Sequence, residues 1–408
     1  MPSLLYVLAV AVFAQGTSEF VLAGLVPGIS ADLGVPVAQA GYLTSGFAVG
    51  MVVGAPLTAA VGRRLPPRWT LTACLLVFVG AHVAGALTES FGVLLATRCV
   101  AAVANAGFLA VALSTVPRVV PAERQARALS VILGGTTLAL VAGVPAGALL
   151  GEVWGWRSAL WAIAGVSAAA LVPVAARTPG RSDRTPHARP DLRAELRALR
   201  SPGLLRVLAL GVLVNGATFC AFTYLAVVVT DGAGLASALV PAVLALFGLG
   251  AFAGIGVAGR FAGTHGRLLL GVAGPALLAG WVTWTALAAS PVAAWVLAPV
   301  QGALSFAVGG TLIARGMAAA HDAPTMGGAY STVALNLGAL VGPVLGGAAI
   351  APLGLVGPLA VSAALAACAV ALGSAKLGSA TPRAAAQPSA TPGPTTLSPA
   401  RDRNHPQP

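Results

Sequence analysis

The chain has 408 residues, of which 57% are hydrophobic and only 8% are charged, and its mean hydropathy is +0.89. Soluble domains average roughly 25% charged residues, so this chain cannot cover itself with polar side chains and must use lipid as its solvent. The net charge of +12 does not indicate nucleic-acid binding, because the arginines form short clusters between apolar runs without interleaved aromatic residues. The four cysteines are far apart inside apolar runs, so neither a metal site nor a cofactor is expected.

Twelve apolar runs are long enough to cross a membrane, given roughly 20 residues per crossing. The first run contains Glu19, has no basic residue before it and is too long for the apolar part of a signal peptide, so it is interpreted as a span. The predicted fold class is an all-α membrane protein with twelve transmembrane helices. The spans fall at 4–26, 38–60, 70–87, 92–116, 128–151, 158–176, 205–230, 235–259, 267–288, 292–314, 328–350 and 353–374.

The basic residues predict the orientation, because cytoplasmic loops of membrane proteins carry an excess of Lys and Arg. With the N-terminus inside, 21 of the 23 basic residues fall in cytoplasmic segments. Arg157 alone falls outside, and Arg98 lies within the fourth span. Both termini are therefore predicted to be cytoplasmic, in a multi-pass protein of the cell (inner) membrane.

Residues 177–204 interrupt the hydrophobic pattern and divide the chain into two six-helix bundles, 1–176 and 205–376. Within this predicted cytoplasmic loop, leucines form one helical stripe opposite arginines. That pattern suits either a helix on the anionic inner leaflet or a solvated linker helix. The tail, 377–408, is rich in Pro, Ala, Ser and Thr, and is predicted to be disordered and cytoplasmic.

The two halves repeat in sequence at an offset of about 200 residues. Gln15-Gly16 falls on Asn215-Gly216, and the Gly-Val-Pro string at 143–145 has a Gly-Pro pair at 342–343 as its counterpart. Repeats of this kind predict two parallel, pseudo-symmetric six-helix bundles with a substrate path between them.

One loop and one span resemble motifs of the major facilitator superfamily. The segment Ala55-Pro-Leu-Thr-Ala-Ala-Val-Gly-Arg-Arg64 resembles its signature loop: Gly62, Arg63 and Arg64 match, whereas Ala59 replaces the usual acidic residue. Span five contains Gly143, Pro145 and Gly147 in an arrangement similar to the Gly-Pro motif of the superfamily's exporters. These two motifs are assigned to gating, with packing of the glycines against span eight as the alternative.

Four longer strings, 14–24, 104–112, 215–224 and 300–309, are similar to actinobacterial chloramphenicol-resistance exporters, within the drug:proton antiporters with twelve spans. The resemblance implies proton-coupled efflux of amphiphilic drugs, foremost chloramphenicol, by alternating access. The implied partners are a small drug, protons and the lipid bilayer, and the protein is expected to be a monomer.

Other classes of function remain to be weighed. An exporter of a sugar or other small metabolite with the same fold is the open alternative. An enzyme is not predicted, because the spans contain no paired carboxylates, no His-rich cluster and no Ser/His arrangement. An ATP-driven pump is not predicted either, because the chain has no G-x-x-x-x-G-K-[ST] loop.

Two charged residues lie within predicted spans, Glu19 in the first and Arg98 in the fourth. A charge within lipid is costly, so an intramembrane carboxylate is a functional candidate. At 1.5 Å per residue, both lie about 10 Å below the predicted outer surface, at depths that permit contact. Both are assigned to proton coupling, and a static ion pair joining spans one and four is the alternative. His82 in span three is interpreted as a packing residue.

The substrate path is expected to be apolar with a few polar groups. Amides and aromatic side chains inside the spans are the candidates for drug contact. They are Gln15, Asn105, Asn215, Phe219, Tyr224, Phe247, Gln301 and Asn336.

Overall fold

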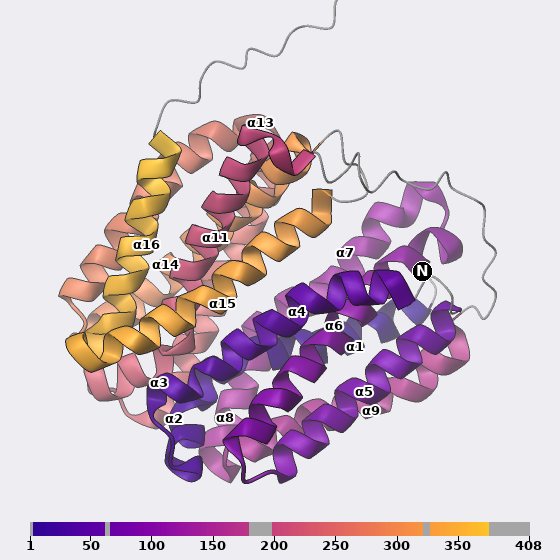
Figure 1. Ribbon diagram of the computed structural model, residues 1–408, viewed down its shortest axis with the longest axis horizontal. Coiled ribbons are helices and arrows are strands. Elements are labelled where there is room, and N and C mark those ends of the chain that lie inside the picture. Colours follow the sequence, from indigo (N-terminus) through magenta and orange to yellow (C-terminus); the bar gives the residue numbers. More distant parts are fainter. Residues whose placement is uncertain (1–2, 62–65, 179–197, 321–326, 375–408) are drawn as a thin grey trace, which may run out of the picture. The chain divides into compact units, whose positions relative to one another are not determined.

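The computed structural model describes residues 3–61, 66–178, 198–320 and 327–374, and these residues form helices joined by short turns (Figure 1). Helices are expected in lipid, because every backbone N–H and C=O must there find its partner within the segment. Gly62, Arg63 and Arg64 of the signature loop lie outside the described residues. So do most of the central loop, at 179–197, and the tail from 375 onward.

The first half begins with a helix that is interrupted at Val21, where the N–H of Gly24 bonds to a carbonyl oxygen only three residues back. A second break lies at Gly41, and a π-helical turn, η2, interrupts the fifth span just before Pro145. The helices are α1 (Ser3–Phe20), α2 (Leu22–Leu33), α3 (Val37–Ala40), α4 (Tyr42–Val61), α5 (Pro67–Leu87), α6 (Phe91–Val119), α7 (Ala122–Leu138), η2 (Ala139–Gly143), α8 (Val144–Trp154) and α9 (Trp156–Arg177).

The second half has the same succession of long apolar helices. Its elements are η3 (Ala198–Arg200), α11 (Pro202–Thr223), α12 (Leu225–Val227), η4 (Val228–Gly232), η5 (Ser237–Leu239), α13 (Val240–Ala286), α14 (Pro291–Ala319), α15 (Gly327–Leu353), η6 (Gly354–Val356) and α16 (Gly357–Ser374).

Ten helical stretches of the described residues are long and apolar enough to cross a membrane. Eight of them have 18 to 33 residues, whereas Ser237–Ala286 has 50 and Gly328–Ser374 has 47. Within the first of these long stretches, His265 departs from helical geometry (φ −123°, ψ 22°). Within the second, Gly354 has a positive φ of 64° between α15 and α16. Both irregular points lie at or beside the gaps that the sequence predicts between spans.

Glycines bring pairs of helix backbones into contact in both halves, at positions 200 residues apart. A Cβ added at Gly50 would overlap the carbonyl oxygen of Cys99, and one at Gly250 would overlap that of Pro299. Close backbone approach at small residues is the usual way in which helices pack in lipid. The crossing of α4 with α6 is therefore repeated by α13 with α14, so the predicted internal repeat is visible in the packing. Gly54 with Val103 and Gly254 with Ala303 form a second matching pair of crossings.

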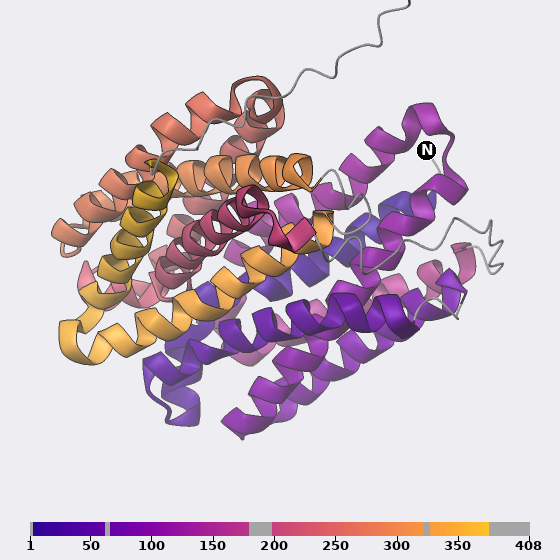
Figure 2. The ribbon, with the colours of Figure 1, turned by 45° about the horizontal axis from the view of Figure 1, so that its top comes forward.

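Hydrogen bonds between the two halves lie toward one end of the protein. This end carries α2, α3 and the end of α8, and we call it the α3 end. The Tyr224 hydroxyl of the second half lies 3.3 Å from the carbonyl oxygen of Ala38 in the first. The Ser237 hydroxyl donates to Glu152 over 2.6 Å. In Figures 1 and 2, α2 and α3 lie beside the lower end of α15, with which α3 is in contact.

Arg157 joins three connections at the α3 end. It forms an ion pair with Asp32 in the last turn of α2 and donates a hydrogen bond of 3.0 Å to the carbonyl oxygen of Thr88 after α5. Its guanidinium also lies 4.3 Å from the ring centroid of Trp156, which itself donates to Asp32 over 3.0 Å. The one arginine that the sequence places in an outer loop therefore has its charge balanced by a carboxylate.

We expect the Arg157–Asp32 pair to contribute modestly to stability and to do so in a pH-dependent way. The hydrogen bond from Arg157, with a second from Trp156, lowers the pKa of Asp32 from its ordinary value of 3.8. A carboxyl with a lowered pKa stabilises the fold above its ordinary pKa, and this contribution is lost as the pH falls through the folded value. The side chains are 31% and 45% exposed, so the coupling should be about 0.2–1 kcal/mol.

A double-mutant cycle with Arg157→Gln and Asp32→Asn, measured by thermal unfolding in detergent, checks this prediction. The coupling should be present at pH 7 and should vanish as the pH falls well below 3.8. A coupling that persists unchanged in acid would contradict it.

Candidate functional site

Glu19 lies in the last turn of α1, directly before the break at Val21. The helix then continues as α2 to Leu33, whereas the sequence prediction ended the first span at 26. Glu19 therefore lies 14 residues, or about 21 Å along the axis, from the end of this helical stretch. The helix runs seven residues beyond the predicted end of the first span, because the apolar run alone does not reveal that it continues through Pro27 to Leu33.

A buried polar network surrounds Ser18, the residue before Glu19. Arg98 on α6 donates from Nη1 to the Ser18 hydroxyl over 2.8 Å and from Nη2 to the Ser18 carbonyl oxygen. His82 on α5 places Nε2 2.7 Å from the same hydroxyl, and its Nδ1 lies 2.8 Å from the carbonyl oxygen of Phe78. The guanidinium of Arg98 also lies 4.7 Å from the ring centroid of Phe47. Arg98 and His82 are each only 2% exposed.

Glu19 itself is partly exposed and has no hydrogen bond within the described part of the chain. The ion pair found among the described residues is Arg157–Asp32, so Glu19 and Arg98 do not form a direct one. The static ion pair considered from sequence is therefore absent from this conformation. Arg98 instead bonds to Ser18, the residue before Glu19. The guanidinium of Arg98 and the carboxylate of Glu19 are therefore close in the fold but form no direct ion pair.

Four phenylalanines form a cluster between the two halves. Phe20 on α1 lies 5.8 Å from Phe219 and 6.4 Å from Phe222 between ring centroids, and Phe222 lies 4.8 Å from Phe247 on α13. All four side chains are buried. Phe222 was considered from the sequence among the aromatic side chains near the predicted path, whereas Phe20 was not.

Consecutive residues on a helix project about 100° apart, since there are 3.6 residues per turn. Ser18 faces the polar network and Phe20 faces the aromatic cluster, so Glu19 projects between them. Gln15 lies four residues earlier and shares the face of Glu19. Its side chain is 1% exposed, and neither its amide nitrogen nor its amide oxygen has a partner among the described residues.

The other predicted amides lie apart from this arrangement. Asn105 makes a weak contact of 3.6 Å with the sulfur of Met51. Three amides of the second half donate to backbone carbonyl oxygens, and these are Asn215 to Leu335 (2.6 Å), Gln301 to Leu277 (3.2 Å) and Asn336 to Thr332 (3.0 Å). Tyr224 lies at the α3 end, where its hydroxyl is 2.8 Å from the carbonyl oxygen of Pro343.

The glycines of the span-five motif pack against the first span. Side chains added at Gly143 and Gly147 would overlap Thr17 and Val21, respectively. Gly151 continues the series, so that three glycines spaced four residues apart face one ridge of α1 and α2. These glycines therefore pack against span one. The alternative considered from the sequence was packing against span eight. Pro145 follows the π-helical turn at the same place.

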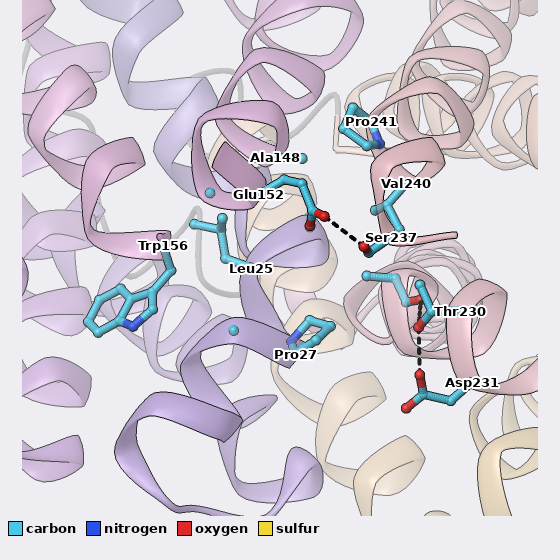
Figure 3. Close-up of a pocket in the computed structure, with 14 residues that line it drawn as sticks. Leu25, Pro27, Ala148, Glu152, Trp156, Thr230, Asp231, Ser237, Val240 and Pro241 are labelled. Atoms are coloured by element: carbon cyan, nitrogen blue, oxygen red, sulfur yellow. Dashed lines mark hydrogen bonds between the residues drawn. The ribbon is translucent and has the colours of Figure 1, made fainter. Parts of the chain in front are cut away.

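A cavity of about 220 Å³ lies between the halves at the α3 end (Figure 3). Its walls include Leu25 and Trp156, and its polar side chains include Glu152, Asp231 and Ser237. Figure 3 shows Glu152 and Ser237 pointing toward one another across it. Pockets for drug-sized ligands are usually about 300–1,000 Å³, so this space is small for such a ligand. Sequence reasoning placed no candidate here.

Comparison with known proteins identifies the family. The sequence profile of the Major Facilitator Superfamily matches residues 8–334. The chain belongs to the Major Facilitator Superfamily. It is 55% identical over 346 residues to a chloramphenicol resistance protein of Streptomyces lividans, covering 85% of this chain and 88% of that one. It is 33% identical to the inner membrane transport protein YdhP of Escherichia coli K12, again covering 85% and 88%.

Solved structures of other transporters share the fold. A bacterial homologue of the human lysosomal transporter Spinster, in an inward-facing and unoccupied conformation, superimposes with a TM-score of 0.73 at 18% identity, covering 91% of this chain and 95% of that one. The nucleoside transporter NupG, in a mutant form, gives 0.72 at 13% identity over 91% and 97%. The chain is therefore a multi-pass membrane protein of a transporter family.

Proposed function

We propose that this member of the superfamily exports a neutral amphiphilic drug, foremost chloramphenicol, in exchange for protons. The observation that carries the proposal is the position of Glu19. It is the one acidic residue well inside a span, and it projects between a buried arginine network and an aromatic cluster at the interface of the halves. The name of the Streptomyces lividans relative, a chloramphenicol resistance protein, supports chloramphenicol as the drug.

The proposed membrane arrangement has twelve crossings in two six-helix bundles, 1–176 and 205–376. A stretch of 47 or 50 residues would be about 70–75 Å long at 1.5 Å per residue. The hydrocarbon core is only about 30 Å thick. Each long stretch therefore crosses twice, with the irregular points at His265 and Gly354 near the membrane surface.

The proposed orientation places both termini, the loop 177–204 and the tail 377–408 in the cytoplasm, on the strength of the arginine distribution. The α3 end then faces the outside. Since the hydrogen bonds between the halves lie toward that end, we assign this conformation to the inward-facing state of alternating access. A monomer is the proposed working unit.

In this arrangement the drug contacts the aromatic cluster and Gln15. Phe219 and Phe247 offer apolar faces, and the unpartnered amide of Gln15 offers a donor and an acceptor for a polar group. Asn105, in the same half as Gln15, is a further candidate for contact with the drug. The amides of Asn215, Gln301 and Asn336 already bond to backbone carbonyl oxygens, so we assign them a packing role. A sugar exporter is not favoured, because the groups at the interface are mostly phenylalanines.

Cells that express the protein should resist chloramphenicol without altering it. Intact drug should be recovered from the medium, and the amount inside the cells should rise when an uncoupler collapses the proton gradient. Cells with an empty vector and cells expressing an inactive variant provide the baseline. Recovery of a modified drug, or unchanged accumulation on uncoupling, would contradict the proposal.

A further inference from the structure

The polar network beside Glu19 holds two residues to which the proposed mechanism gives no role, Ser18 and His82. We propose that they are positioning residues: they hold Arg98 away from Glu19 and thereby set the pH range over which drug and proton exchange. This inference rests on the proposed function, because it concerns the same carboxylate.

The directions of the hydrogen bonds follow from the chemistry of the donors. A guanidinium can only donate, so the Ser18 hydroxyl accepts from Arg98. The carbonyl oxygen of Phe78 can only accept, so Nδ1 of His82 carries the hydrogen there. In a neutral imidazole, Nε2 is then a bare acceptor, and it receives the hydrogen of the Ser18 hydroxyl. Every bond of the network is satisfied only when His82 is neutral with its proton on Nδ1.

The network restrains Arg98 at one atom in particular. Nη2 bonds to the Ser18 carbonyl oxygen, which any residue at that position would supply, whereas Nη1 depends on the hydroxyl. Nε of Arg98 has no partner among the described residues. Without the hydroxyl, Nη1 would be a second buried donor without a partner, and a buried donor of this kind is costly. The carboxylate of Glu19, on the next residue, could then satisfy it.

Few other ionisable groups approach this site. Cys99 on α6 follows Arg98 directly, and α4 contributes the apolar face of Phe47. The charged residues of α7, α8 and α9, which also pack against α1, lie near the ends of those helices. They are Glu123, Arg124, Arg127, Glu152, Arg157 and Arg177.

The test measures proton release when chloramphenicol is added to the purified protein in detergent, across a range of pH. In Ser18→Ala, Arg98 should pair with Glu19 and favour the ionised carboxylate, so the pH midpoint of release should fall by about 1 to 3 units. Ser18→Thr keeps a hydroxyl and should restore the midpoint. His82→Phe keeps an aromatic ring against Phe78 but removes the nitrogen that accepts from Ser18. It should lower the pH midpoint as Ser18→Ala does, but by less.

Two further variants separate positioning from general damage. Ser167 is a fully buried serine on α9 whose hydroxyl has no partner in the described part of the chain, so Ser167→Ala should leave the midpoint unchanged. Because the effect of Ser18 acts through Arg98, Ser18→Ala should have no additional effect in an Arg98→Ala background. A Ser18→Ala midpoint equal to that of the wild type, or an undiminished shift without Arg98, would overturn the inference.

Failure of the proposed function gives a different result, since the wild type would then release no proton on drug addition at any pH. A second measurement does not need the drug. Nitrogen-15 NMR of histidine-labelled protein, with His82→Gln used to identify the signal, should show a neutral His82 with its proton on Nδ1 at pH 7. A proton on Nε2, or a charged ring, would overturn the inference even where transport is intact.

Discussion

Replacing Glu19 with glutamine should abolish uphill drug transport in proteoliposomes while leaving downhill exchange of the drug measurable. Glutamine keeps the volume and much of the hydrogen bonding of the side chain but cannot carry a proton. Exchange of a neutral drug for one proton moves one net charge, so each 100 mV of membrane potential supplies about 2.3 kcal/mol. At about 1.4 kcal/mol per tenfold, that energy sustains roughly a fiftyfold drug gradient. The Glu19→Gln variant should sustain no drug gradient.

Glu89→Gln is the matched control, because Glu89 is an exposed carboxylate in the turn between α5 and α6. It should transport like the wild type. Arg98→Ala should move the pH midpoint of transport upward, since Glu19 loses a nearby positive charge that favours its ionised form. Full uphill transport by Glu19→Gln would remove Glu19 from the mechanism, and His82 would be the next residue to replace.

Replacing Gly248 with alanine should disfavour the conformation that is closed at the α3 end. Gly248 on α13 faces η2 in the other half, and an added Cβ would overlap the carbonyl oxygen of Leu140. Backbone atoms cannot rotate away as a side chain can, so the halves must separate. Overpacking of this kind costs about 1–3 kcal/mol, which corresponds to roughly a five- to 150-fold change in the equilibrium between the two states.

Glu152 and Ser237 form a hydrogen bond across the interface of the halves. Cysteines that replace both residues should react with a short bifunctional thiol reagent when the α3 end is closed, so crosslinking reports closure. Crosslinking should be efficient in the parent protein and should fall several-fold with Gly248→Ala, together with drug export. Gly256→Ala on the same helix has open space around it and should change neither. Equal crosslinking in the two variants would show that the overlap is relieved within one half.

The helices and the internal repeat follow from sequence patterns, because lipid requires long apolar helices and close packing in lipid requires small residues. The breaks at Val21 and Gly41 do not follow, since both lie inside predicted spans with no proline beside them. Likewise, the extension of the first helical stretch to Leu33 adds polar residues that an apolar run does not include.

The site was predictable in its charged members, because a carboxylate or guanidinium within a span stands out from the composition. Its neutral members were not. Ser18 carries no sequence signal except its place before Glu19, and Phe20 is one of many apolar residues whose partners come from another helix. Tyr224 was predicted as a drug contact, but its hydroxyl bonds to backbone carbonyls, which no single-sequence pattern reveals.

The repeat at an offset of 200 residues gives each position of the charged network a counterpart in the second half. Glu19 corresponds to Phe219 and Arg98 to Ala298. Because the same glycine crossings form around both sets, the scaffold packs equally well with and without charge at these places. The second half therefore shows which uncharged residues, phenylalanine at the place of Glu19 and alanine at the place of Arg98, the repeat unit accommodates.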